Sequence, residues 1–262
     1  MNEVNNTLYI PLYGKSYVSR KGILLHDQKA EEIWSAEGFY LKGKAKSKWL
    51  AYYMGMRSAV FDNWISQKMQ QHPDAVVLHI GCGMDSRVDR VEASGHFWYD
   101  IDFPDVIQER KRYFKENESY NMIGSDARDK DWMKLIPDNP SAIIIMEGIS
   151  MYMSESELCE LFNRLSSKFS RVQVLMDCYT TFAAKASKYK NPINEVGVTD
   201  VHGIDDPREF EYTTDLHFLK EHELTPNSMI EQLSGIERFI FKKVFAGRFA
   251  KKMYRLYEFC SK

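Results

Sequence analysis

With 262 residues, 44% of them hydrophobic, the chain can bury a substantial core, and we expect one large domain with additions. Its 35 basic and 37 acidic residues leave a formal net charge of -2. That balance gives no field strong enough to favour nucleic acid or an acidic membrane as the main partner.

The cysteines and the first residues bear on the cell compartment. The four cysteines show neither C-x-x-C spacing nor a zinc-like cluster with histidine, so we expect no metal site and a reduced, cytoplasmic setting. The N-terminus lacks the cationic start and apolar core of a signal peptide, and no apolar run approaches the roughly 20 residues that span a bilayer. The sequence thus predicts a soluble, non-secreted protein.

Residues 1–72 precede the first predicted strand and have a helical pattern. Asp27 is placed to cap one helix. From Lys46 to Gln71 large side chains recur at helical spacing, namely Trp49, Tyr52, Tyr53, Met56, Val60, Phe61, Trp64 and Ile65. This stripe favours core packing, and we interpret the segment as a helical leader.

A strand, a glycine turn and a helix follow. The apolar run 76–80 stops at the turn formed by Gly81 and Gly83, and residues 86–93 have a helical pattern. A second run, 97–102, ends in Asp102 just before Pro104 opens another helix. This is a nucleotide-binding arrangement, because the glycines let the backbone approach a ligand and the acid accepts hydrogen bonds from ribose hydroxyls.

The glycine pattern also discriminates between nucleotides. Ser86 stands where G-x-G-x-x-G has its third glycine, which serves close packing around a pyrophosphate. The departure argues against NAD or FAD. S-adenosylmethionine contains ribose and adenine but no phosphate, and it fits the remaining pattern. The alternative is a purely structural turn between strand and helix.

Further strands are predicted at 120–124, 142–147 and 172–177. Between the last two, Ser154 and Glu157 form a capping box ahead of a helix with a buried stripe at Leu158, Leu161, Phe162 and Leu165. Near-continuous apolar strands separated by helices indicate an α/β fold with a parallel sheet covered on both faces.

The remaining chain is less regular. Residues 180–215 contain a helix-like piece and then a stretch rich in Pro, Gly and Asp at 191–207, which we interpret as a substrate-side insertion. A sixth strand is expected at 216–224, a helix at 236–246 and a final strand at 254–260. The single domain thus divides into a leader at 1–72, a cofactor-binding core at 73–179, the insertion at 180–215 and C-terminal elements at 216–262.

Four segments stand in a fixed order along the core: HIGCGMDSR at 79–87, WYDIDFPD at 98–105, SDARD at 125–129 and EGISMY at 147–152. Together they resemble the leucine carboxyl methyltransferase family, which includes tetracenomycin-type polyketide O-methyltransferases. The resemblance implies a class I S-adenosylmethionine-dependent methyltransferase. Its fold would be a doubly wound, mostly parallel seven-stranded sheet that ends in an antiparallel strand, with the helical leader covering the cofactor.

The resemblance also implies cofactor-binding residues. The turn would be Gly81 and Gly83, the ribose would bind Asp102, and the adenine would be bordered by Asp126 and Ala127.

Three further positions follow from the same comparison. Glu147 would lie near the ribose or the methionine end of the cofactor. Residues 56–62 resemble a segment whose arginine, here Arg57, lies near the cofactor's carboxylate, a task suited to its planar fork. Lys15 resembles an early basic contact. No metal ligand is implied.

Methyl transfer needs positioning more than a strong base, because the cofactor carries the activated group. Tyr152 and His202 are candidates to deprotonate or orient a hydroxyl acceptor, as is Asp177, although each also has a structural explanation.

We therefore expect an O-methyltransferase acting on a hydroxyl or carboxylate of a small molecule. The alternatives are methylation of a protein C-terminal carboxylate and a cofactor-binding protein without turnover. Two departures from the family pattern, Ala127 and Ser150, leave the shape of the site open.

Overall fold

The computed structural model describes residues 8–37, 41, 43–92, 95–187, 201–247, 250 and 252–261. Within them the strands are β1 Val76–Ile80, β2 Trp98–Asp102, β3 Tyr120–Gly124, β4 Ser141–Met146, β5 Arg171–Tyr179, β6 Leu216–Glu221 and β7 Tyr254–Ser261. The helices are α1 Tyr9–Arg20, α2 Gln28–Glu37, α3 Lys48–Gln71, α4 Arg87–Arg90, α5 Pro104–Arg110, α6 Glu155–Lys168, α7 Thr181–Ser187, α8 Phe210–Thr213, α9 Asn227–Ile230 and α10 Gly235–Val244.

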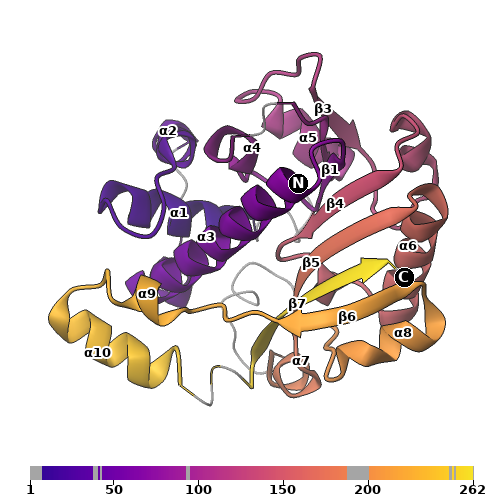
Figure 1. The fold of residues 1–262 in the computed structure, drawn as a ribbon. Coiled ribbons are helices and arrows are strands. Elements are labelled where there is room, and N and C mark those ends of the chain that lie inside the picture. The colour runs from indigo at the N-terminus through magenta and orange to yellow at the C-terminus, as the bar shows by residue number, and fades with distance from the viewer. Residues whose placement is uncertain are drawn as a thin grey trace.

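The strands of the described chain form one seven-stranded sheet in the order β3-β2-β1-β4-β5-β7-β6 (Figure 1). The first five strands pair in parallel, whereas β7 runs antiparallel to both β5 and β6. The strand order reverses direction at β1, next to β4, and such a switch point is where ligands bind in open α/β sheets. The expected doubly wound sheet with an antiparallel last strand is confirmed.

Alternate residues of the central strands enter two separate cores. On β1, Val77 faces the core that contains α3, whereas Leu78 faces the core that contains α6. The same alternation separates Ile143 from Ile144 on β4. Helices therefore cover both faces of the sheet, which explains why these strands are apolar along their whole length.

The long helix α3 confirms the helix expected near Lys46 to Gln71. Its first turn is capped by Ser47, whose side chain accepts a hydrogen bond from the amide of Trp49. Apolar side chains bury it against α1 and the sheet. The expected capping box is present in α6, where Ser154 and Glu157 satisfy each other's backbone amides.

The helix expected at 86–93 is wrong in extent, because α4 covers only Arg87–Arg90. Ser86 does not cap it; its hydroxyl instead donates to Asp27 at 2.5 Å. Both arginines of the short helix are buried in ion pairs with Asp62. These ion pairs join segments that are distant in the sequence, so local periodicity does not report them.

The connection after β5 returns to the carboxyl edge of the sheet. It begins with α7, and Gly203 later makes a parallel bridge to Tyr179 at the end of β5. Residues 188–200 of the predicted insertion lie outside the described residues. The predicted sixth strand ends earlier than expected, at Glu221. None of the described helices has the length and apolar character to cross a membrane.

Candidate active site

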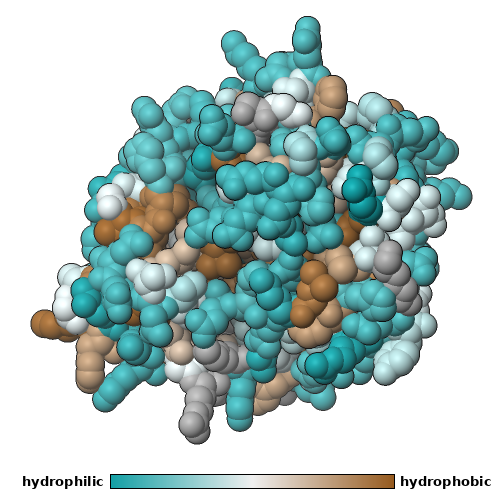
Figure 2. All heavy atoms as spheres, in the orientation of Figure 1, coloured by the Kyte–Doolittle hydropathy of each residue, from teal (hydrophilic) through white to brown (hydrophobic). Residues whose placement is uncertain are grey.

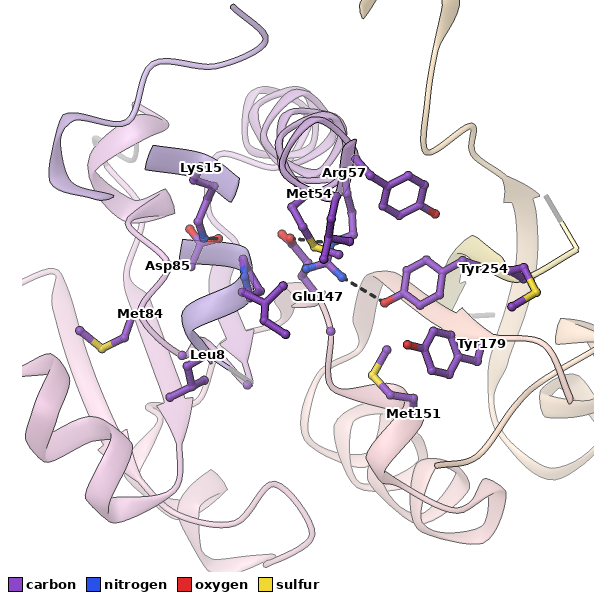
Figure 3. Close-up of a pocket in the computed structure, with 18 of the residues that line it drawn as sticks. Leu8, Lys15, Met54, Arg57, Met84, Asp85, Glu147, Met151, Tyr179 and Tyr254 are labelled. Carbon is purple, nitrogen blue, oxygen red and sulfur yellow. Dashed lines mark hydrogen bonds and ion pairs between the residues drawn. The ribbon is translucent and has the colours of Figure 1, made fainter. Parts of the chain in front are cut away.

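A cavity of about 630 Å³ lies at the carboxyl ends of the central strands, between α1, α3 and the segment that joins α10 to β7. Figure 3 shows its two ends. We call the "glycine end" the part lined by Leu8, Lys15, Gly81, Gly83, Met84 and Asp85, and the "tyrosine end" the part lined by Tyr53, Met151, Tyr179 and Tyr254. Arg57 and Glu147 lie between them.

The glycine turn brings backbone to the cavity wall. Gly81 has φ of 71° and Gly83 has φ of 51°, a left-handed conformation that side chains disfavour. A Cβ atom at Gly81 would lie 2.7 Å from the side chain of Ile149, and one at Gly83 would lie 2.8 Å from Leu8 at the start of α1. The turn therefore requires glycine at both positions, and it forms a cradle that a nucleoside can approach closely.

Asp102 supports this turn from the end of β2. One carboxylate oxygen accepts the amide of Gly83 at 2.7 Å, and the other accepts the amide of Phe103 at 2.8 Å. Burial raises the pKa of Asp102 to about 6. Each oxygen keeps a further lone pair, so the carboxylate can also accept hydrogen bonds from ribose hydroxyls.

Two guanidinium groups hold Glu147 at the end of β4. Arg57 on α3 donates from Nε to Glu147 at 3.0 Å, and Arg87 donates to its other oxygen. Although burial alone would raise the pKa of Glu147, the charges of Arg87 and Arg57 hold it below its usual value. Glu147 is therefore an ionised anchor for Arg57.

The same arginine joins a second carboxylate and a phenol at the tyrosine end. Arg57 Nη1 lies 3.2 Å from Asp177 Oδ2 and 3.1 Å from the hydroxyl of Tyr254. Tyr254 in turn donates to Asp177 at 2.9 Å, and the amide of Gly148 donates to the other oxygen at 2.7 Å. Burial raises the pKa of Asp177 to about 6 and also raises that of Tyr254.

At the glycine end, α1 is joined to the turn by a buried ion pair. Lys15 Nζ lies 2.6 Å from Asp85, and both side chains are nearly inaccessible. Arg87 and Arg90 also contact Asp85, and with Lys15 they hold its pKa well below the usual range despite burial. Lys15 thus fastens α1 over the glycine turn.

The structure brings together most of the predicted site residues. Lys15, Arg57, Gly81, Gly83 and Glu147 line the cavity, and Asp102 lies directly behind Gly83 through its hydrogen bond. Tyr152 lines the cavity as well.

Besides Asp102, three predicted residues do not line the cavity. Asp126 is ion-paired with Arg128 at 2.6 Å and is partly exposed, and Ala127 packs in the α6 core. His202 is exposed, and its backbone amide donates to the carbonyl of Met151 at 2.8 Å. The roles that the sequence suggests for these three residues stay predictions.

The sequence did not identify Asp85 as the partner of Lys15 or Tyr254 as the partner of Arg57 and Asp177. Asp85 stands inside the quoted motif at 79–87, so its position was visible but its role was not. Tyr254 had no local signal, because the final strand reaches the cavity only through its antiparallel pairing with β5. Its ring lies 5.1 Å from that of Tyr179 and 6.3 Å from that of Tyr53, which completes the tyrosine end.

The comparison with protein families gives a match to the model described as "Leucine carboxyl methyltransferase", over residues 11–166. This range includes the glycine turn, Asp102 and Glu147. It also includes Lys15 on α1 and Arg57 on α3, so the helices that close the cavity belong to the matched region.

Two curated relatives are similar over about three quarters of their length. The tetracenomycin polyketide synthesis O-methyltransferase TcmP of Streptomyces glaucescens is 29% identical over 204 residues, which cover 76% of each chain. The S-adenosyl-L-methionine-dependent methyltransferase dpfgK of Gibberella zeae is 24% identical over 228 residues, covering 78% of this chain and 76% of the relative.

Two solved structures with a similar fold are described as methyltransferases. Magnesium protoporphyrin IX methyltransferase from Synechocystis, with bound SAH, superposes with a TM-score of 0.52 at 11% identity, covering 88% of this chain and 93% of that one. A putative methyltransferase from Thermobifida fusca gives 0.51 at 11% identity, covering 95% and 94%. At such identities the likeness concerns the fold.

Proposed function

Because the chain belongs to the leucine carboxyl methyltransferase family, and is thus an S-adenosylmethionine-dependent methyltransferase, we propose that its acceptor is an oxygen atom of a small, largely apolar molecule. One relative, TcmP, is described as an O-methyltransferase of polyketide synthesis, which supports oxygen as the acceptor atom.

The cofactor is assigned to the glycine end and the centre of the cavity. The left-handed turn at Gly81 and Gly83 leaves backbone exposed to a nucleoside, and Asp102 offers lone pairs to its ribose. Arg57 supplies a cation for the methionine carboxylate. Bound there, S-adenosylmethionine would supply an electrophilic methyl group.

The acceptor is assigned to the tyrosine end, where the walls are aromatic rings and methionines. Flat apolar molecules fit such walls, because rings stack and thioethers adapt to irregular shapes. A second cavity of about 330 Å³ shares Tyr53, Phe245, Ala250 and Tyr254 with the first, so a longer acceptor has room to extend.

One observation favours a carboxylate over an alcohol. Among the described lining residues, the tyrosine end offers phenols as its titratable groups, and burial raises the pKa of Tyr53 and Tyr254 above the usual value. Asp177 is fully buried behind this wall, where Arg57 and Tyr254 contact its carboxylate. His79 of β1 also lines the cavity, but burial lowers its pKa and its ring lies 3.3 Å from Arg87. An acceptor that is already ionised at neutral pH needs no general base.

The chain's own residues would then act by position and charge. The rings of the tyrosine end would shield the reacting oxygen from water. The hydroxyl of Tyr254 donates its one proton to Asp177 and accepts from Arg57, so it would hold Arg57 in place as the positive charge that orients an anionic acceptor. Since the displacement is in line, this orientation determines the rate more than proton transfer does.

The test uses S-adenosylmethionine with a deuterated methyl group and three matched acceptors: an aromatic carboxylic acid, the corresponding alcohol and the corresponding amine. Mass spectrometry of the product should show the label in the ester, at a rate that is flat between about pH 6 and 8 when S-adenosylmethionine is saturating. A label in the alcohol with a rate that rises over that range would favour the hydroxyl reading and a base. A label on nitrogen would contradict the proposal.

A further inference from the structure

The helix α10 is apolar on two opposite sides, although only one side is packed. Its inner side holds Phe241, which is fully buried, and the following Phe245 stacks on Trp49 of α3 at 5.7 Å. On the outer side Ile236 is 79% exposed and Phe239 is 61% exposed. In Figure 2 brown and tan side chains protrude at the lower left, where Figure 1 places α10. Exposed apolar groups gathered on one helix face mark an interaction surface more often than scattered ones do.

The exposed charged residues of α10 are all basic. Lys242 and Lys243 are exposed, and Lys243 Nζ lies 4.5 Å from the ring centre of Phe239. Arg238 is exposed as well, but its guanidinium donates to the carbonyl of Leu233 at 3.1 Å. In the sequence, residues 235–253 contain six Lys or Arg residues and a single acid, Glu237.

That acid turns inward. Glu237 pairs with Lys48 at 2.8 Å and accepts from Tyr52 at 2.7 Å, so it does not offset the outer charges. Basic residues flanking an exposed apolar stripe are the pattern of helices that lie in the interface of an anionic membrane.

We propose that this outer face of α10, formed by Ile236, Phe239, Lys242 and Lys243, docks the protein on an anionic lipid surface. The helix lies flat, with Ile236 and Phe239 among the acyl chains and the cations at the headgroups. A symmetric dimer through the same face is disfavoured, since it would set these cations against those of the second copy.

The end of α10 lies next to the active-site cavity. Val244, at the end of α10, is 56% exposed and also lines the active-site cavity. A lipid surface bound to α10 therefore lies beside the cavity. Apolar molecules are concentrated in a bilayer, so such a surface would bring them close to the cavity. The sequence-based expectation that an acidic membrane is not a main partner rested on the charge of the whole chain, which averages out this basic segment.

The experiment measures binding of the full-length protein to vesicles by co-sedimentation. Vesicles of phosphatidylcholine alone are compared with vesicles of phosphatidylcholine and phosphatidylglycerol in equal parts. The wild type should bind the anionic vesicles and release them as salt is raised. The double variant Lys242→Gln/Lys243→Gln should bind about 30-fold more weakly, since each lysine near an anionic surface contributes about fivefold.

Phe239→Ala should lose about tenfold through its lost apolar burial. The matched controls are Lys134→Gln and Leu135→Ala, which change an exposed lysine and a 66% exposed leucine away from α10. They should bind like the wild type.

Three outcomes would overturn the proposal. These are no binding of the wild type to anionic vesicles, equal binding to the two vesicle types, and equal losses in the control variants. A dimer of the wild type that binds no vesicle, and that Phe239→Ala dissociates, would show that the face is instead a protein interface. Because binding is read without turnover, these outcomes are independent of the acceptor's identity.

Discussion

Replacing Arg57 by lysine should separate the ligands that carry a carboxylate from those that do not. The guanidinium contacts Glu147, Asp177 and Tyr254 from one buried position in the middle of α3. Lysine keeps the positive charge, but a single ammonium group on a flexible stem cannot reproduce the planar fork. Arg57→Ala would be less informative, because removing the guanidinium from two buried carboxylates, Glu147 and Asp177, costs about 3 to 5 kcal/mol in folding.

The magnitude follows from the number of contacts. If the variant loses one charge-assisted hydrogen bond to the cofactor's carboxylate, binding should weaken by about 2 kcal/mol, or about 30-fold. Methylthioadenosine lacks that carboxylate, so its affinity should change by less than about threefold. Both titrations use the same variant, so its loss of folding stability is the same in both. That loss cannot produce a difference between the two ligands.

The assay is calorimetric titration with S-adenosylhomocysteine and with methylthioadenosine, below the unfolding temperature of each protein. Arg90→Lys is the matched control, because Arg90 is equally buried and ion-paired but does not line the cavity. It should lose stability without discriminating between the ligands. Equal losses of both ligands in Arg57→Lys would refute the assignment of Arg57 to the carboxylate.

Three further predictions concern single positions. Because burial raises the pKa of Asp102 to about 6, S-adenosylhomocysteine should bind the wild type more weakly as the pH falls through 6 and the carboxylate gains a proton, whereas Asp102→Asn should bind weakly at every pH. A variant that kept the same pH dependence would point to Asp177, whose pKa is also raised to about 6. Gly81→Ala should lose about 1 to 3 kcal/mol of stability in chemical denaturation, since φ is 71° and the new methyl group would meet Ile149; an unchanged midpoint would contradict this. Ser154→Ala should cost about 1 kcal/mol through the lost cap and leave ligand affinity unchanged, so a change in affinity would show that α6 is coupled to the site.

Local patterns in the sequence predicted the elements whose cause is local. The strand at 120–124 and the capping box at Ser154 depend on neighbouring residues, and both appear as expected. The helix after the glycine turn is shorter than expected, and its Arg87 and Arg90 pair with carboxylates from α3 and from the segment before α2. Pairing between distant segments leaves no periodic signal.

The residues of the site also divide into those that a local pattern predicts and those that it does not. Gly81, Gly83 and Asp102 follow from one strand-turn-strand pattern, so they could be found in the sequence. The tyrosine end could not, because it joins Tyr53 of α3 to Tyr254 of β7 across about 200 residues of chain, a distance that only folding closes. The outer face of α10 was hidden for a different reason, since the net charge of -2 sums over the basic and acidic regions.

The most direct test of the assigned site is a crystal structure of the protein with S-adenosylhomocysteine. We expect the ribose hydroxyls at Asp102, the backbone of the turn from Gly81 to Gly83 against the nucleoside, and the carboxylate within hydrogen-bond distance of Arg57. The sulfur should then point toward Tyr254 and the tyrosine end. A ligand bound in the reverse direction, with adenine at the tyrosine end or its carboxylate away from Arg57, would contradict the assignment of both ends of the cavity.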